Sequence, residues 1–549
     1  MTAWQYIADA CRGEHARFRE ALRHPDTAQA AQLRQILSAN ASSAAGRRLG
    51  FARLRDAQDY RKAVPLGTYA DVAAEIERMA AGEPGRLVGA DVVACELTSG
   101  SGAAAKLVPY TTEGLAGFRR AVEPWLCDLL ASRPGIARGR AYWAISPVGR
   151  RPARATDPVP VGLDDAQYLG PALAPLFARL LAAPPSLRTM SDVASWRYWL
   201  LRYLLDAADL TFISVWSPTF LLPLIETLQR EGERLAHDLA AGTVSWSRAD
   251  PATPRASFEP RLQRAQALRQ ALSAPVLDLT LLWPRLDTIS CWTHASAAPF
   301  AGLLARHLPG VHIQGKGLLA TEAAVSVPLE AWEYPVLALH SGFFEFLDDD
   351  GCSHLAHELD TGGRYRIVVT TASGLYRYDL GDSVRVRGFA VRTPMLEFVG
   401  RAGLVSDLCG EKLADDFVAG ALDGIRGFAM VAPLPPPARG YALLLDADGP
   451  EAAQADATAA TVEQRLQANP HYEYARRLGQ LDSVAAVQVQ RPLDGLLGLG
   501  LARGSRLGDI KPAALCTSPD WIDHFRLDGC DGAPVALRAD HHDPAGVQP

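Results

Sequence analysis

The pattern of apolar residues changes along this chain of 549 residues, and these changes constrain its fold more than any other feature. In residues 5–83 apolar positions recur three and four apart, which is typical of helices. Strand-like and helical segments alternate in residues 90–272, and short strand-like segments separated by turns fill 286–400. After Arg401 the pattern returns to mixed segments. The sequence therefore predicts an α/β protein of more than one domain, with a boundary at 401–403.

The overall composition excludes several classes of protein and of partner. Apolar residues make up 48% of the chain and charged residues 21%, which excludes a disordered chain or a coiled coil as an overall description. The formal net charge is −6, so the chain has no basic field that could hold nucleic acid or an anionic membrane surface. We therefore expect small-molecule partners and neither nucleic acid nor a membrane.

Three features bear on where the protein works. Residues 1–22 have a helical pattern with Asp9, Glu14 and Glu20, and they lack the apolar core of a signal peptide. The apolar stretch 210–228 is interrupted by two prolines and a glutamate, which favours a buried strand followed by a helix over a membrane span. The eight cysteines are scattered without a CxxC pair, as expected of reduced thiols. We expect a cytoplasmic protein.

A loop of small and hydroxyl residues follows the strand-like segment 90–97. It contains Ser99, Gly100 and Ser101 and ends at Lys106. Small residues let backbone N–H groups approach an anion, hydroxyls donate further hydrogen bonds, and a lysine adds a point charge. This is the composition of a phosphate-binding loop, although its spacing differs from that of a Walker loop. An ordinary flexible Gly/Ser turn is the alternative interpretation.

Lysine is scarce in this chain, because the 55 basic residues include only five lysines. The wide, planar fork of arginine cannot imitate a compact ammonium at a phosphate, so the remaining lysines are worth locating. The alternative is that they sit on solvated surfaces, as lysines usually do. They are Lys62, Lys106, Lys316, Lys412 and Lys511.

Two nucleotide-binding patterns occur around Lys316, and neither has the required context. Residues 310–316 match GxxxxGK, but the intervening residues are strand-like and Gly317 stands where Mg²⁺ coordination needs Ser or Thr. Residues 315–320 match GxGxxA, yet strand-like residues follow where a dinucleotide fold requires a helix. Glu322, just beyond, is a carboxylate beside a Gly-rich turn, a setting that can hold Mg²⁺.

The segment Tyr376–Asp382 places two carboxylates around a glycine between strand-like segments. An ionised carboxylate offers acceptors only, so Asp382 could accept both hydroxyls of a ribose. A β-turn aspartate is the alternative, since Asp is common in turns.

Taken in order, several stretches of the sequence resemble the Gretchen-Hagen acyl acid amido synthetases. This family belongs to the acyl-adenylate-forming superfamily, which also contains luciferases and acyl-CoA synthetases. Each stretch is weak by itself, whereas the ordered set spans most of the chain. The stretches are ELTSGSGAAAKLVPYT (96–111), KGLLATEAAVSVPL (316–329), GFFEF (342–346), GLYRYDLGDSVRVRGF (374–389), FVGRAGLVSDLCGEK (398–412), NPHYEYARRLGQL (469–481) and GDIKP (508–512).

The resemblance implies a fold and a division of labour. A large N-terminal adenylate-forming domain of mixed sheets flanked by helices, here 1–401, would carry the ATP and acyl sites. A small mobile α+β domain, here 402–549, would swing over them. The family pattern has an aromatic residue just before the Thr-Glu pair, where this chain has Leu318, Leu319 and Ala320.

The resemblance also assigns roles to single residues. Ser99, Gly100 and Ser101, with Lys106 at the end of their loop, would hold the ATP phosphates. Thr321 would contact the α-phosphate and Glu322 would hold Mg²⁺. The remaining assignments are a ribose-binding acid, a basic residue at the hinge, two residues near adenine and a lysine of the C-terminal domain: Asp382, Arg401, Phe343, Glu345 and Lys511.

The chemistry that these groups suit is the activation of a carboxylic acid. Attack of the acid on the α-phosphorus of ATP gives an acyl-adenylate and pyrophosphate, and the negative charge that accumulates calls for Mg²⁺, N–H groups and a lysine. The predicted function is transfer of the acyl group to an amine or amino acid. Two alternatives stay open: transfer to a thiol of coenzyme A or of a carrier protein, and nucleotide binding without turnover.

Overall fold

The computed structural model describes residues 2–97, 106–143, 158–163, 168–246, 252–254, 256–401, 404–435, 438–505 and 510–527. The chain divides into two compact units: Met1–Gly403 with Leu497–Pro512, and Leu404–Leu496 with Ala513–Pro549. The sequence pattern assigned Leu497–Pro512 to the C-terminal domain, whereas the structure packs this segment with the first unit. Because Lys511 belongs to it, the local surroundings of Lys511 are those of the first unit.

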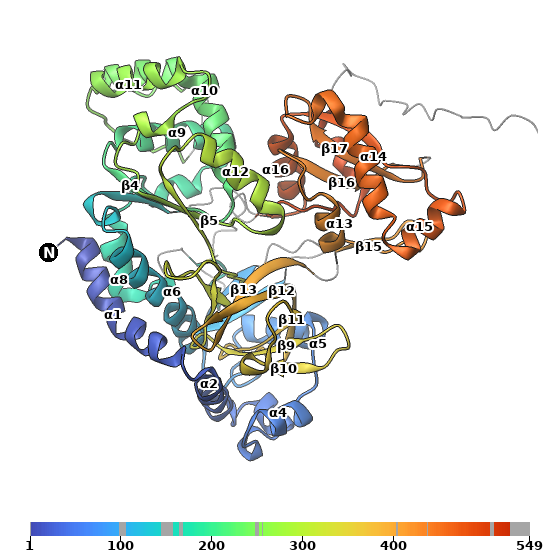
Figure 1. Cartoon of the computed structure of the whole chain (residues 1–549). Helices are drawn as coiled ribbons and strands as arrows, with labels where there is room; N and C mark the ends of the chain where they lie inside the picture. Colours follow the sequence, from blue (N-terminus) through green and yellow to red (C-terminus); the bar gives the residue numbers. More distant parts are fainter. Residues whose placement is uncertain are drawn as a thin grey trace, which may run out of the picture. The chain divides into compact units, whose positions relative to one another are not determined.

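The first unit opens with helices α1 to α5, which confirms the helical pattern of residues 5–83 (Figure 1). A capping box of Thr2 and Gln5 starts α1, and the helix buries apolar side chains three and four positions apart. The Trp4 indole donates to the Gly139 carbonyl oxygen at 2.8 Å, so α1 is attached to a distant part of the unit. The bounds are α1 (Ala3–Ala21), α2 (Pro25–Asn40), α3 (Ala44–Leu49), α4 (Ala57–Ala63) and α5 (Tyr69–Ala80).

A four-stranded parallel sheet forms the next layer. Parallel strands need long crossover connections, and helices supply them here. Figure 1 shows α9 to α12 gathered beside this sheet. The strands, in their order across the sheet, are β3 (Arg140–Trp143), β4 (Leu210–Ser214), β5 (Thr288–Cys291) and β6 (His312–Gly315). The helices are α8 (Gly170–Ala178), α9 (Val193–Asp206), α10 (Pro218–Ala241), α11 (Leu262–Leu272) and α12 (Ala298–Arg306).

Two predictions of secondary structure can be compared with the elements observed in this layer. The apolar stretch 210–228 is strand β4 followed by the start of α10, as predicted. No helix in the described ranges is long and apolar enough to cross a membrane. The prediction that residues 286–400 contain only strands is wrong, because α12 lies between β5 and β6. This helix has nine residues, so its apolar period covers too few turns to stand out.

An antiparallel hairpin and a seven-stranded sheet complete the first unit. The hairpin pairs β1 (Val92–Leu97) with β2 (Leu107–Thr111), and α6 (Thr112–Ser132) follows directly. The strands of the large sheet, in spatial order, are β10 (Ser353–Leu355), β9 (Phe343–Leu347), β11 (Arg364–Thr370), β12 (Tyr378–Ala390), β13 (Thr393–Arg401), β8 (Val336–Leu337) and β7 (Ser326–Val327).

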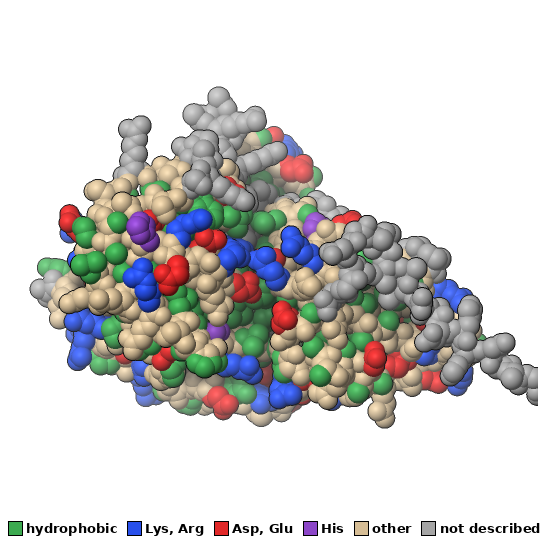
Figure 2. All heavy atoms as spheres, turned by 90° about the horizontal axis from the view of Figure 1, so that it is seen from above, with side chains coloured by type: hydrophobic (Ala, Val, Ile, Leu, Met, Phe, Trp, Pro, Cys, Tyr) green, Lys and Arg blue, Asp and Glu red, His purple; other side chains and the backbone are tan. Residues whose placement is uncertain are grey.

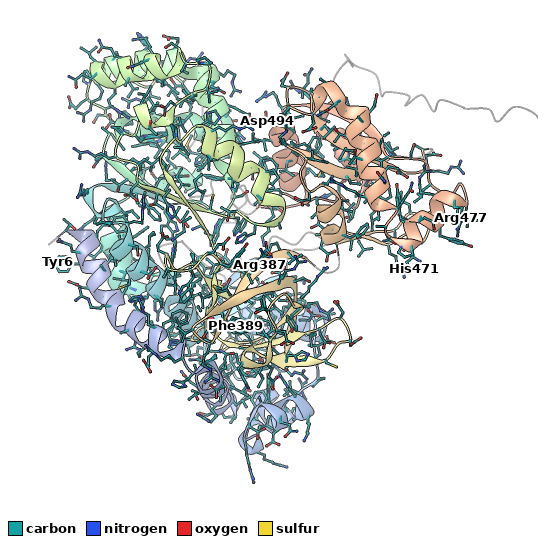
Figure 3. All side chains as sticks on the ribbon, viewed as in Figure 1. Tyr6, Arg387, Phe389, His471, Arg477 and Asp494 are labelled. Carbon is teal, nitrogen blue, oxygen red and sulfur yellow. The ribbon has the colours of Figure 1, made fainter. Side chains whose placement is uncertain are left out.

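A stack of three side chains connects the two sheets of the first unit. The guanidinium of Arg387, on β12 (Figure 3), lies 4.9 Å from the ring centre of Tyr334. His294, three residues after β5, stacks on the same ring at 5.6 Å. Burial lowers the pKa of His294, which favours the neutral imidazole in this stack.

The second unit has its own core and its own sheet. Its strands, in spatial order, are β16 (Ala429–Pro433), β17 (Tyr441–Asp446), β18 (Ala485–Gln490) and β19 (Arg526–Leu527), and a two-stranded pair β14 (Val405–Ser406) and β15 (Leu413–Ala414) precedes them. The helices are α13 (Asp415–Ala421), α14 (Ala455–Leu466), α15 (Pro470–Arg477) and α16 (Pro492–Ala502), the last of which runs into the segment that packs with the first unit. The predicted Ala-rich helix near 450–467 is α14.

Charged side chains of both signs are interspersed on the face that Figure 2 shows.

Candidate functional site

Strand β2 connects predicted site residues that lie far apart in the sequence. At its start, the Lys106 ammonium lies 3.5 Å from the Tyr378 hydroxyl of β12 and 5.6 Å from the ring centre of Tyr69. Near its end, the Tyr110 hydroxyl donates to the backbone carbonyl of Thr321. The hairpin therefore lines up the predicted phosphate-binding lysine, the Thr321–Glu322 pair and the beginning of β12 along one strand.

Glu322 is a buried carboxylate in this place, with an exposed fraction of 7%. Burial raises the pKa of the Tyr69 hydroxyl, and the negative charge of Glu322 adds to that rise. Burial likewise raises the pKa of Tyr110 well above its ordinary value, with contributions from Tyr168 and Glu322. Glu322 thus acts electrostatically on Tyr69 and on Tyr110, and both hydroxyls stay protonated near neutral pH.

Asp382 lies inside strand β12, so its interpretation as a β-turn aspartate is wrong. Asp379, on the same strand, has a carboxylate that accepts from the Gly381 N–H at 3.0 Å and from Arg366 at 2.8 Å. Gly381 has φ of +78°, a conformation that favours glycine. Asp382 itself is buried, with 3% exposed, and its backbone pairs with that of Arg401 on β13.

Ser99, Gly100 and Ser101 lie outside the described residues. The residues that bracket their loop are described, since Leu97 of β1 pairs with Leu107 of β2 at the end of the hairpin. The predicted role of this loop in binding ATP phosphates stays a prediction.

Phe343 and Glu345, predicted near adenine, lie on β9 in the interior of the large sheet, with exposed fractions of 1% and 0%. Both oxygens of Glu345 are engaged: Oε2 accepts from Arg377 at 3.0 Å, and Oε1 accepts from Arg61 at 3.1 Å and from Ser353 at 2.8 Å. These contacts give Glu345 a structural role in the sheet. Its predicted approach to adenine stays untested.

Lys511 is exposed, and its ammonium lies 5.1 Å from the ring centre of Trp292, one residue after β5. Trp292 in turn packs against Trp216, which follows β4, with ring centres 6.0 Å apart. The lysine therefore stands over the edge of the parallel sheet where its strands end. Ligands of open α/β sheets bind at this edge.

The donor set around Glu322 fits Mg²⁺ only as a site shared with the nucleotide. No group of three or more His, Cys, Asp or Glu side chains that could hold a metal ion occurs in the part of the chain that the structure describes. Mg²⁺ is commonly held by one or two carboxylates together with substrate phosphates. A single buried carboxylate such as Glu322 matches that mode.

The hydroxyls of Tyr69, Tyr110 and Tyr378 are site features that the sequence analysis did not single out for function. Tyr378 stands in the stretch that led to Asp382, and Tyr110 in the stretch that led to Lys106. Their closeness in sequence to these predicted residues could have marked both tyrosines as site residues. Tyr69 offered none, because it begins a helix far from every recognised motif.

Comparison with solved structures identifies the fold of this protein. Its structure is similar to that of the GH3.15 acyl acid amido synthetase, with a TM-score of 0.79 at 21% identity over 93% of this chain and 96% of that chain. A second structure of that enzyme, in complex with 2,4-DB, gives a TM-score of 0.81 at 23% identity over 95% of this chain and 97% of that chain. The fold is that of an acyl acid amido synthetase.

The family follows from the sequence itself. Residues 14–313 match the GH3 family N-terminal domain, and residues 335–401 match the GH3 family central domain. The chain belongs to the GH3 family, which confirms the predicted family and fold class.

Named relatives agree with this placement. The chain is 23% identical to the indole-3-acetic acid-amido synthetase GH3.2 of Arabidopsis thaliana over 72% of this chain and 77% of that protein. It is 27% identical to the indole-3-acetic acid-amido synthetase GH3.15 of the same plant over 70% and 69%. It is also 27% identical to the probable indole-3-acetic acid-amido synthetase GH3.12 of Oryza sativa subsp. japonica over 74% of each.

Proposed function

We propose that this chain is an ATP-dependent ligase that converts a carboxylic acid into its acyl-adenylate and transfers the acyl group to an amine or amino acid. Its family and its fold support the class of reaction. The observation that carries the proposal is the convergence on β2: Lys106 at one end reaches β12, and Tyr110 near the other end reaches Thr321 beside Glu322.

The residues have separate tasks in the first half of the reaction. Thr321, together with the loop of Ser99, Gly100, Ser101 and Lys106, binds ATP phosphate groups, and Asp382 accepts from the ribose. Glu322 would hold Mg²⁺, which neutralises phosphate charge when it is bound. The acid's carboxylate attacks the α-phosphorus, and the bond to pyrophosphate breaks. The charge that develops on the α-phosphate is met by cationic groups, among which we include Lys511.

The second half of the reaction needs an acceptor and protection from water. The nitrogen of the amine attacks the acyl carbonyl, the amide bond forms, and AMP leaves with the electron pair of the broken bond. We assign the ATP and acyl sites to residues 1–401 and the mobile domain to residues 402–549, with Arg401 at the hinge. Movement of such a domain excludes water from the activated acid.

The names of the relatives suggest the first substrates to try: an indole- or aryl-substituted acid, and an amino acid as acceptor. A cytoplasmic location fits the cysteines of the described ranges, which are free thiols.

Carboxylate-dependent exchange of ³²P between pyrophosphate and ATP tests adenylation directly. A panel of aromatic and aliphatic acids, with indole-3-acetate among them, should give exchange with at least one acid, and the exchange should require Mg²⁺. The best acid is then combined with twenty amino acids and, separately, with coenzyme A. Amide formation supports the ligase; thioester formation alone would favour the thiol alternative, and no exchange with any acid would favour a nucleotide-binding relative.

A further inference from the structure

Lys316 is a buried cation at the carboxyl ends of the parallel strands. Only 6% of it is exposed, and its backbone N–H donates to the carbonyl of Cys291, the last residue of β5, at 2.8 Å. Its ammonium donates to the hydroxyl of Ser214, the last residue of β4, at 2.8 Å. Lys316 itself directly follows β6. The lysine thus joins the ends of three neighbouring strands.

Three indole rings surround the same ammonium. It lies 4.6 Å from the ring centre of Trp125, 5.5 Å from that of Trp143 and 5.6 Å from that of Trp216. Cation–π contacts are strongest where the cation is removed from water, as it is in buried contacts such as these. Trp125 is fixed in turn, because its indole N–H donates to Gln314 at 2.7 Å. The ammonium is therefore held in place before any ligand binds.

Neither nucleotide-binding pattern explains this lysine. β6 occupies the residues that a P-loop would need for its phosphate cradle. A side chain at Gly317 would place its Cβ 1.8 Å from the Ser326 carbonyl oxygen, so close backbone approach explains the glycine. The role of Lys316 therefore has to be read from its own contacts.

The indoles around Lys316 continue toward Lys511. Trp143, Trp216 and Trp292 are each half-buried, and Trp216 packs on Trp292, over which Lys511 lies. A wall of flat aromatic rings therefore leads from the buried ammonium to the exposed one, along the edge of the sheet where ligands bind. Flat rings suit a planar acyl group, and an ammonium suits a carboxylate.

We propose that Lys316 is a specificity-determining residue, whose ammonium binds the carboxylate of a planar aromatic acid while the indoles contact its ring. This inference rests on the proposed function, since the acid is the substrate of the adenylation step. The ammonium of Lys316 favours a charged acid over an uncharged molecule of the same shape. Replacing a charge-assisted contact in a buried site by an apolar group removes that preference.

The test compares benzoate with benzamide, which have the same ring and differ in charge. Binding to the full-length protein without ATP is followed by tryptophan fluorescence and by calorimetry. Wild type should bind benzoate at least tenfold more tightly than benzamide, and Lys316→Met should bind the two within about twofold, while its affinity for ATP and Mg²⁺ stays at the wild-type value. Lys62→Met is the matched control, because Lys62 is exposed on α4, and it should keep the preference.

Each outcome bears on the proposal. A Lys316→Met protein that keeps the preference overturns it, and so does a wild type that binds neither compound or binds both equally. If Lys316→Met does not fold, Lys316→Arg keeps a cation in a wider shape and should weaken benzoate binding more than benzamide binding; equal weakening overturns the proposal. The exchange assay separates this inference from the ligase proposal. If wild type catalyses exchange and Lys316→Met still prefers benzoate to benzamide, the inference alone is overturned. If Lys316→Met loses this preference and wild type shows no exchange with any acid, the ligase proposal alone is overturned.

Discussion

The antiparallel and the parallel sheet of the first unit each contain a buried charged side chain, and the groups that contact these two side chains differ. Glu345, in the antiparallel sheet, is bound by Arg377, Arg61 and Ser353, so its charge is satisfied within the sheet. Lys316, at the edge of the parallel sheet, contacts indole faces and a hydroxyl. The first arrangement holds strands together. The second presents a fixed cation among flat apolar walls at the edge where ligands bind, so we expect stability to depend on one charge and recognition on the other.

The largest effect expected on stability is that of Glu345→Gln. The substitution leaves Arg377 buried beside a neutral amide, and breaking a buried ion pair from one side costs about 3–5 kcal/mol. Urea unfolding of the variant measures this loss. The exposed pair of Glu20 and Arg23 offers the control, because Glu20→Gln should change little. A stable Glu345→Gln protein whose KM for ATP rises would instead support the predicted place of Glu345 near adenine.

Glu322→Gln should act on catalysis, in contrast to Glu345→Gln. Loss of one charged contact to the developing transition state lowers rates by roughly 10²–10³. We expect that decrease in acid-dependent ATP–pyrophosphate exchange, partly relieved by raised Mg²⁺. A thermal unfolding midpoint near that of wild type is the control. An exchange rate within threefold of wild type would remove Glu322 from the site.

Glu14 extends the comparison to a buried charge that depends on pH. It lies 2.7 Å from His340 Nδ1 and 2.6 Å from Arg17, and although burial opposes ionisation, these contacts hold its pKa below the ordinary value. A lowered pKa contributes stability above the unfolded value of about 4.3 and loses it as pH falls through the folded value.

Glu14→Gln should therefore cost about 2 kcal/mol of unfolding free energy at pH 7, as loss of a buried charged hydrogen bond does. The difference from wild type should shrink steadily below pH 4.5. Unfolding in urea at pH 7, 5 and 4 measures it, and a difference that does not vary with pH would contradict the assignment.

The smallest of these effects is expected for Lys511→Ala. Its ammonium is exposed and contacts Trp292, so its loss should leave stability unchanged. Exchange should fall by roughly tenfold or more, as expected when a charge contact to the transition state is removed. The amide-forming step, started from added acyl-adenylate, serves as the internal control and should change less. Unchanged exchange would remove Lys511 from the adenylation mechanism.

Local patterns predicted much of the fold, because they depend on residues close in sequence. The helices of residues 5–83, the strand and helix of 210–228 and the strands that follow residue 335 were all predicted from periodicity. Helix α12 was missed because it is short. The order of the strands in each sheet was not predicted either. Periodicity indicates that a segment is a strand, but it does not indicate which strands become neighbours.

Site residues were recognised where they stood in motifs, and their partners were not. Lys106, Glu322 and Asp382 lie in Gly-rich or acidic stretches that attract attention in a sequence. Tyr69 has no such mark, although its hydroxyl accepts from the Leu107 N–H at 2.8 Å. Arg377 stands in the stretch that led to Asp382, but nothing in that stretch indicates that it binds Glu345.

The sequence by itself determined the family, the reaction class and the segments that carry the chemistry, because these depend on the identity and order of residues. The tertiary structure decided which of those residues work together. It moved Asp382 from a turn into a strand, gave Glu345 two arginine partners and placed the ammonium of Lys316 among three indoles. The reason is physical: the environment of a charge is set by groups that folding brings within a few ångströms, and those groups are spread over hundreds of positions in the chain.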